Sequence, residues 1–185
     1  MIILIYLLLI LIIIFLPFYF LFLINTVLMG GHDLPTSKKA IKKIIKIIAE
    51  KKPGKNNFYD LGSGRGNVVI AVKKKFPQLL VVGIEKRAFQ LFFAKLKTFF
   101  LKSKIVFQKE DLFKADLRDA DIVYAYLWSD IMPSLEEKLQ RELKERTLVI
   151  TNTSYFPNWE PTETYVVWPK KPDFEKLFLY IKKSF

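Results

Sequence analysis

The chain has 185 residues, enough for one domain with a sizeable core. Its 30 Lys and Arg against 18 Asp and Glu give a formal net charge of +12, a balance that indicates an anionic partner such as a membrane surface or nucleic acid. The absence of cysteine excludes disulfides and fits a reducing compartment without requiring one.

The first segment in chain order is apolar throughout. Residues 2–24 contain no charged side chain, and as a helix they would be about 35 Å long, enough to cross a hydrocarbon core of roughly 30 Å. A cleaved signal peptide would have a basic start, a shorter apolar segment and a small-residue cleavage site. A buried core helix is a weaker alternative because the run is apolar on all faces. We therefore predict a transmembrane anchor over residues 1–24, in which Pro17 can kink the helix.

A linker and a lysine-rich segment follow. Residues 25–36 contain two glycines and a proline and are a predicted linker; we assign no role to its His32, the chain's only histidine. By the positive-inside rule, the basic residues after the anchor place the globular part on the cytoplasmic side. They would also attract anionic lipid headgroups, which we favour over nucleic acid as partners. These residues are Lys38, Lys39, Lys42, Lys43, Lys46, Lys51 and Lys52.

Residues 37–185 have the pattern of one α/β domain. Ser37 can cap an amphipathic helix over residues 38–52. Short runs rich in Val and Ile then alternate with helical segments, which predicts a parallel sheet with helices on both faces. The predicted strands are 58–61, 79–85, 104–108, 121–127 and 147–153, and the helices are 66–75, 87–101 and 131–144. Residues 162–169 and 174–183 predict an antiparallel hairpin at the sheet edge.

A glycine-rich turn follows the first predicted strand. Three of the seven glycines lie in DLGSGRGN, residues 60–67, where they let the backbone approach a ligand closely. The turn is not a P-loop, and Asn67 stands where a dinucleotide fold would have its third glycine. Glu85 ends the next strand, where a carboxylate can accept both ribose hydroxyls of an adenosine.

These motifs resemble a known family. DLGSGRGNVVIAV followed by GIEK is similar to the class I S-adenosylmethionine-dependent methyltransferases, over roughly residues 34–160. The whole layout, with LPTSKKAIKKII, DIVYAYLWSDIMPSLEEKL and TLVITNTSYFPNW after an apolar helix, resembles the small membrane-anchored protein-lysine methyltransferases. That group includes the mitochondrial enzymes acting on the c subunit of ATP synthase and on the adenine nucleotide translocase, and bacterial relatives. It implies a Rossmann-like class I methyltransferase sheet in the domain over residues 37–185, with S-adenosyl-L-methionine as cofactor.

The resemblance also implies roles for individual residues. The loop glycines would line the methionine and ribose of the cofactor, Asp60 would meet its ammonium, Glu85 its ribose diol and Asp111 its adenine amino group. Asp60 could instead cap the glycine turn, and Asp111 could cap a helix. Arg65 stands where bacterial relatives often have an acid, and YAYLWS replaces the D/N-P-P-Y of enzymes that methylate adenine bases or glutamine amides. The predicted cofactor-binding residues are Asp60, Gly62, Ser63, Gly64, Gly66, Glu85 and Asp111, and we predict no metal site.

The candidate catalytic residues follow later strands. Tyr126 and Trp128 lie at the exit of the fourth strand and Asn152 at the end of the fifth, although each could equally pack in the core or against a helix. Because burial lowers a lysine pKa, an aromatic channel would favour the neutral amine that accepts a methyl group. A membrane protein with an accessible lysine is the leading substrate. A quinone or lipid headgroup as acceptor, or a non-catalytic cofactor-binding module, remain alternatives.

Overall fold

The computed structural model describes residues 2–28 and 34–183, which form two compact units divided after Leu34. The first unit holds helix α1, Ile2–Leu28, with Pro17 inside it. Residues 25–28, expected in the linker, continue this helix because none of them is glycine or proline. By length and composition, Ile2–Leu21 could cross a membrane. Residues 29–33 of the predicted linker, including His32, lie outside the described residues.

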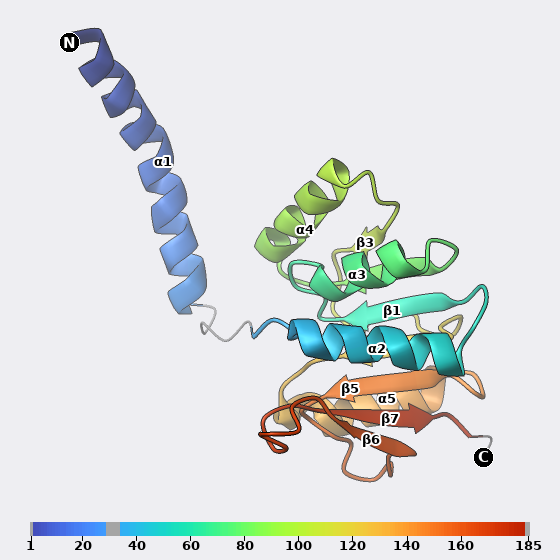
Figure 1. The fold of residues 1–185 in the computed structure, drawn as a ribbon. Coiled ribbons are helices and arrows are strands. Elements are labelled where there is room, and N and C mark those ends of the chain that lie inside the picture. The colour runs from blue at the N-terminus through green and yellow to red at the C-terminus, as the bar shows by residue number, and fades with distance from the viewer. Residues whose placement is uncertain (1, 29–33, 184–185) are drawn as a thin grey trace. The chain divides into compact units, whose positions relative to one another are not determined.

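The second unit, residues 35–185, is built on a mixed sheet (Figure 1). In its described part the strand order is β3-β2-β1-β4-β5-β7-β6. Strands β1 to β5 are parallel, and β7 pairs antiparallel with both β5 and β6. The predicted α/β sheet with a hairpin at its edge is therefore confirmed. The strands are β1 (Asn57–Leu61), β2 (Leu80–Ile84), β3 (Val106–Gln108), β4 (Ile122–Ala125), β5 (Leu148–Asn152), β6 (Glu163–Val166) and β7 (Lys176–Ile181).

The helices of this unit match the predicted ones closely. Ser37 caps the first, its Oγ accepting a hydrogen bond from the Ala40 amide at 3.1 Å, as expected. A 3₁₀ turn precedes the last, and a proline in the first turn of that helix suits its start. The elements are α2 (Lys38–Lys51), α3 (Asn67–Lys75), α4 (Ala88–Phe100), η1 (Ser129–Ile131) and α5 (Met132–Glu142).

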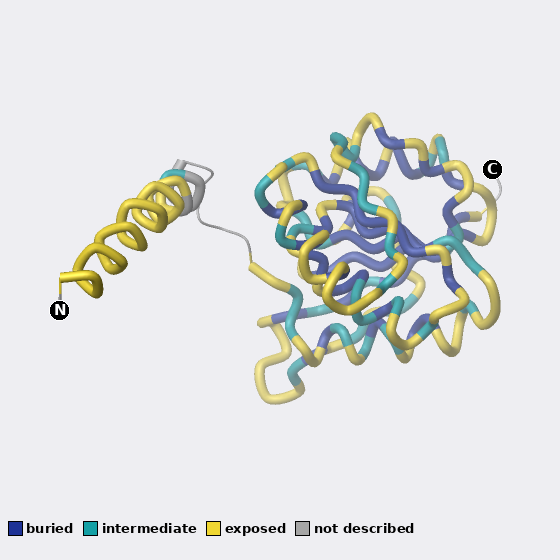
Figure 2. Tube along the Cα trace, turned by 90° about the horizontal axis from the view of Figure 1, so that it is seen from above, coloured by how far each residue is buried: buried dark blue, intermediate teal, exposed yellow. Residues whose placement is uncertain are grey.

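Two apolar cores lie on opposite faces of the sheet, because successive strand side chains alternate between faces. On one face Phe58 packs with residues of α2 and α3. On the other, Tyr59 packs with residues of α5. Figure 2 shows the strands as buried, with exposed segments around them. The carboxyl ends of the parallel strands, and the loops that follow them, therefore lie along one edge of the sheet.

Candidate active site

The glycine turn after β1 has a backbone shape that only glycine adopts readily. Gly62, Gly64 and Gly66 have φ of 76°, 53° and 76°, in the left-handed region that side chains disfavour. The amides of Gly62 and Ser63 both donate to the carbonyl of Ile84 at 2.9 Å, which holds the turn against the end of β2. The turn therefore sits where β1 and β2 end side by side.

The three glycines differ in their surroundings. A Cβ on Gly62 would lie 2.8 Å from the Leu127 side chain, and one on Gly66 would lie 3.2 Å from Ala94 of α4. A Cβ on Gly64 would meet nothing closer than 4.0 Å. Gly62 and Gly66 are thus closely packed against side chains, in addition to having a positive φ. Gly64 borders open space, as expected of a glycine that faces a ligand.

Gly83 supports the turn from the neighbouring strand, a role that the sequence did not point out. A Cβ on Gly83 would lie 2.8 Å from the Ser63 Oγ. That hydroxyl is buried and has no hydrogen-bond partner among the described residues. Its orphaned state indicates a polar group to be supplied from outside the chain.

Two buried carboxylates lie beside the turn. Asp60 and Glu85 are each 3% exposed. Burial, together with the charge of Glu85, raises the pKa of Asp60 to about 8. Glu85 accepts hydrogen bonds from the Gly64 amide at 2.9 Å and from the Arg87 amide and Nε at 2.9 and 3.1 Å. The carboxylate of Glu85 therefore fixes the turn, while that of Asp60 is buried at a cost in free energy.

This arrangement suits a cationic cofactor. A positive charge near Asp60 would favour the ionised carboxylate and remove the cost of burying it. S-adenosylmethionine has an ammonium and a sulfonium group, and its hydroxyls and amine could pair with the buried Ser63 Oγ. The open space at Gly64 leaves room for such a group. The residues present therefore fit S-adenosylmethionine.

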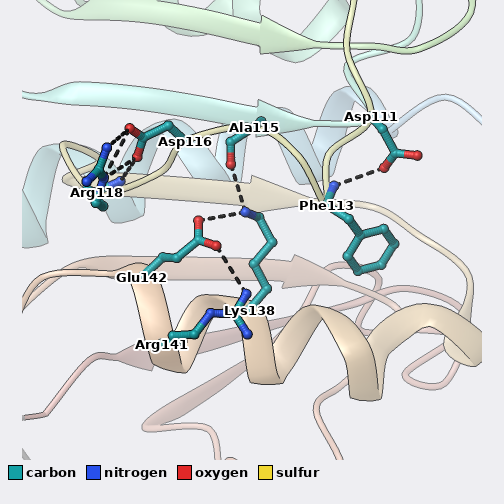
Figure 3. A network of polar contacts seen from close by, with 8 residues as sticks. All are labelled: Asp111, Phe113, Ala115, Asp116, Arg118, Lys138, Arg141 and Glu142. Atoms are coloured by element: carbon teal, nitrogen blue, oxygen red, sulfur yellow. Dashed lines mark hydrogen bonds and ion pairs between the residues drawn. The ribbon is translucent and has the colours of Figure 1, made fainter.

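Asp111 lies in the loop between β3 and β4 (Figure 3). Its Oδ1 accepts a hydrogen bond from the Phe113 amide at 2.9 Å, and its carbonyl accepts from the amides of Lys114 and Ala115. Asp111 thus caps a turn in this structure. The turn fixes the side chain in place, and contact with adenine stays a prediction.

The three candidate catalytic residues have different environments. Tyr126 is half-buried against the core beyond the end of β4. Trp128 is 57% exposed and precedes η1. Because β4 ends at Ala125, strand alternation does not place Trp128 on the face that carries Tyr124. Asn152, the last residue of β5, is fully buried.

Asn152 belongs to a buried polar network. Its Nδ2 donates to the Tyr124 hydroxyl at 3.3 Å and to Glu175 Oε1 at 3.0 Å. Glu175 Oε2 accepts from the Ser37 hydroxyl at 2.6 Å and from the indole of Trp168 at 2.9 Å. The network thus ties the start of α2 to β5 and to the residue before β7. Sequence reasoning missed Glu175, since no local motif marks it.

The network also reaches the buried carboxylate of β1. The hydroxyls of Thr36 and Tyr124 are 2.8 Å apart. Burial raises the pKa of Tyr124, and the charge of Asp60 adds to that shift. The segment before α2 is therefore held at the carboxyl edge of the sheet by side chains that lie close to Asp60.

A groove of about 770 Å³ opens beside this segment. Its lining is mainly apolar, and no predicted site residue contributes to it. It lies between the start of α2 and helices α3 and α4. The lining residues are Pro35, Thr36, Ser37, Lys38, Ile41, Asn67, Ile70, Lys97, Phe100 and Leu101.

Five parallel strands with an antiparallel pair at one edge, this glycine turn after β1 and an acid after β2 agree with the class I S-adenosylmethionine-dependent methyltransferases. Residues 60–163, more than half of the chain, match the family model described as the ANTKMT methyltransferase domain, and the chain belongs to that family.

Two relatives agree with this assignment, and a solved structure has a similar fold. The chain is 26% identical to a protein-lysine N-methyltransferase from Saccharolobus islandicus, over 72% of this chain and 83% of the relative. It is 27% identical to the mouse lysine N-methyltransferase for the C subunit of ATP synthase over 71% of this chain, but the match spans only 52% of the mouse protein. Its fold is similar to that of an RNA methyltransferase from Salinibacter ruber in complex with S-adenosyl-L-homocysteine, with a TM-score of 0.73 and 23% identity, covering 82% of this chain and 95% of the other.

Proposed function

We propose that this protein is a membrane-anchored protein-lysine N-methyltransferase that uses S-adenosyl-L-methionine. The observation that carries the proposal is the left-handed glycine turn beside two buried carboxylates, Asp60 and Glu85. The relatives named above for lysine methylation support lysine as the acceptor.

The residues around the turn bind and orient the cofactor. When bound, S-adenosylmethionine supplies a methyl group that is already activated by the sulfonium. Asp60 would hold the positive charge of the cofactor as the ionised carboxylate, and Glu85 would hold the ribose hydroxyls. Three protein donors already hold Glu85 in place, so little side-chain entropy is lost on binding.

Tyr126 and Trp128 are the residues proposed to contact the acceptor lysine. Methyl transfer requires a neutral amine in line with the methyl group at near-attack distance. Aromatic rings exclude water from the amine and so lower its pKa. Asn152 acts through the network, because its amide holds Tyr124 and Glu175 rather than pointing to open space.

The proposed location is a membrane, with one spanning helix and the methyltransferase domain on its cytoplasmic side. The length and composition of α1 support the span, and the lysines of α2 support the orientation. Tethering raises the effective concentration of targets at the same surface. We therefore propose a membrane-associated protein with an accessible lysine as the substrate.

A small apolar acceptor, such as a quinone or a lipid, is the second candidate. The observation in its favour is the apolar groove of about 770 Å³, whose wall includes Asn67, directly after the glycine turn. A groove of this size falls within the range of small-molecule sites.

Methyl transfer to membranes distinguishes the two candidates. The full chain in mild detergent is incubated with methyl-tritiated S-adenosylmethionine and membranes from a host that lacks the gene, and protein is then separated from lipid. We expect label in the protein fraction with the native chain, and none with the Gly64→Val variant. Label confined to the organic phase would show that the acceptor is a small molecule and not a lysine.

A further inference from the structure

The outer face of helix α4 is apolar and exposed, although the helix already buries an apolar face inward. Leu91, Ala94 and Thr98 are buried against the domain. The exposed apolar residues of the helix are separated by four, three and one residues, so they share the opposite side of the helix. This outer face consists of Phe92 (60% exposed), Leu96 (39%), Phe99 (76%) and Phe100 (74%), continued by Leu101 (60%).

Single exposed apolar side chains are common, but a continuous group of large ones indicates an interaction site. The rings of Phe99 and Phe100 meet edge to face with centroids 5.7 Å apart. Both rings nevertheless keep about three quarters of their surface in solvent. The described domain therefore leaves this aromatic cluster uncovered.

The charges around the outer face identify what could cover it. From Lys86 to Lys109 the chain has seven basic residues and no acidic one. Lys95 flanks the face on one side and Lys102 follows it. Lys97, on the other side, donates instead to the Arg65 carbonyl and to Asn67 Oδ1. A helix with aromatic residues on one side and lysines beside them is typical of elements that lie in a membrane interface. Negatively charged headgroups are complementary to this ring of lysines.

The outer face of α4 lies close to the residue at which the chain enters the domain. Phe100 and Leu101 line the same groove as Pro35, the first residue of the domain. Seven peptide units connect Leu28, the end of α1, to Pro35, so the tether spans at most about 25 Å. The outer face of α4 is therefore near the point where the chain enters the domain from the proposed anchor.

We propose that the outer face of α4 inserts into the headgroup region of an anionic bilayer, as a second membrane contact besides α1. The aromatic side chains enter the interface while Lys95 and Lys102 pair with lipid phosphates. This contact holds the methyltransferase domain in one orientation on the surface and so limits which lysines reach the site. The inference rests on the membrane anchoring in the proposed function, but not on lysine being the acceptor.

Because the chain has no cysteine, a single spin label can be placed at will. The full-length Phe99→Cys variant is labelled with a nitroxide and reconstituted into vesicles of phosphatidylcholine and phosphatidylglycerol. The matched control is Glu137→Cys, at an exposed position on α5. The measurement is the accessibility of each label to oxygen, which concentrates in the bilayer, and to a nickel chelate, which stays in water.

We expect the Phe99 label to be protected from nickel and accessible to oxygen, and the Glu137 label to show the reverse. Replacing Lys95 and Lys102 by glutamine should shift the inserted population back towards water, by about fivefold in the equilibrium for each lysine. Equal nickel accessibility at both positions, or failure of the protein to float with the vesicles, would overturn the proposal. Dipolar broadening between labels at Phe99 would overturn it in favour of a second copy of the chain.

The readout is independent of methylation. If the Phe99 label is immersed but no lysine is methylated, the proposed function fails and the membrane contact stands. If lysine is methylated while the Phe99 label stays in water, the function stands and the contact is wrong. If the Phe99 label is protected from nickel only when host membrane proteins are added, the outer face binds a protein partner, and the lipid contact is also overturned.

Discussion

Replacing Asp60 by asparagine is expected to stabilise the cofactor-free protein and to weaken its binding of cofactor. The pKa of Asp60 rises from 3.8 to about 8 on folding. At pH 7 that shift opposes folding by about 4 kcal/mol, at 1.36 kcal/mol per pH unit. In the variant, burying the asparagine amide without hydrogen-bond partners costs on the order of 2 kcal/mol, which offsets part of this gain. The net gain of about 2 kcal/mol corresponds to a rise in Tm of about 4–8 °C.

The gain should depend on pH in a defined direction. Folding tightens proton binding at Asp60, so the native protein loses stability as the pH rises from about 4 to about 8. The Asp60→Asn variant lacks this loss. Its advantage should therefore be absent below about pH 3, where the carboxyl is protonated in both states and only the cost of the amide remains, and complete above about pH 8.

Thermal unfolding followed by tryptophan fluorescence measures both effects in the full chain. Asp173→Asn is the matched control, since the side chain of Asp173 is 90% exposed and its loss should leave Tm unchanged. Adding S-adenosylhomocysteine, which keeps the ammonium, should raise Tm more in the native protein than in Asp60→Asn. A lower Tm for cofactor-free Asp60→Asn at pH 7, or a gain that does not vary with pH, would refute the reasoning.

Three further variants probe the site. Gly64→Val should abolish cofactor binding in a titration. The control Gly54→Val, at a position outside the site with φ of 105°, should lower stability and leave binding intact. Loss of binding in both variants would contradict the assigned role of the turn. Glu85→Ala should weaken cofactor binding by about 1.5–3 kcal/mol for each lost hydrogen bond, and an unchanged Kd would show that Glu85 does not hold the ribose. Glu175→Gln places an amide against side-chain donors and should lower stability by about 1–3 kcal/mol in thermal unfolding, so an unchanged Tm would mean that the network contributes little.

Local patterns were sufficient to predict the sheet and the glycine turn. Apolar runs of four to seven residues separate cleanly from amphipathic segments, so β1 and β2 lie within a residue of their expected positions. The positive φ of Gly62, Gly64 and Gly66 follows from a residue type that has few other reasons to recur at this spacing. The predicted end of β4 lies two residues beyond the observed one, because an aromatic run does not reveal where a strand loses its partner.

Long-range contacts could not be predicted in the same way. Ser37 and Glu175 form a hydrogen bond across 138 residues of sequence, and no pattern on either side identifies the partner. Gly83 lies in an ordinary apolar strand, and its need for a small side chain comes from Ser63 on the neighbouring turn. Helix α4 is apolar on two sides, so periodicity alone does not tell which side the domain covers.

The most direct test of the central claim is the chemical identity of the methylated product. Membranes labelled with methyl-tritiated S-adenosylmethionine by the full chain are stripped of lipid, the protein is hydrolysed in acid, and the amino acids are separated. We predict that the label elutes as methylated lysine and is absent when Gly64→Val replaces the native protein. Label in another amino acid, or recovered only with the lipid, would contradict the proposed lysine methyltransferase.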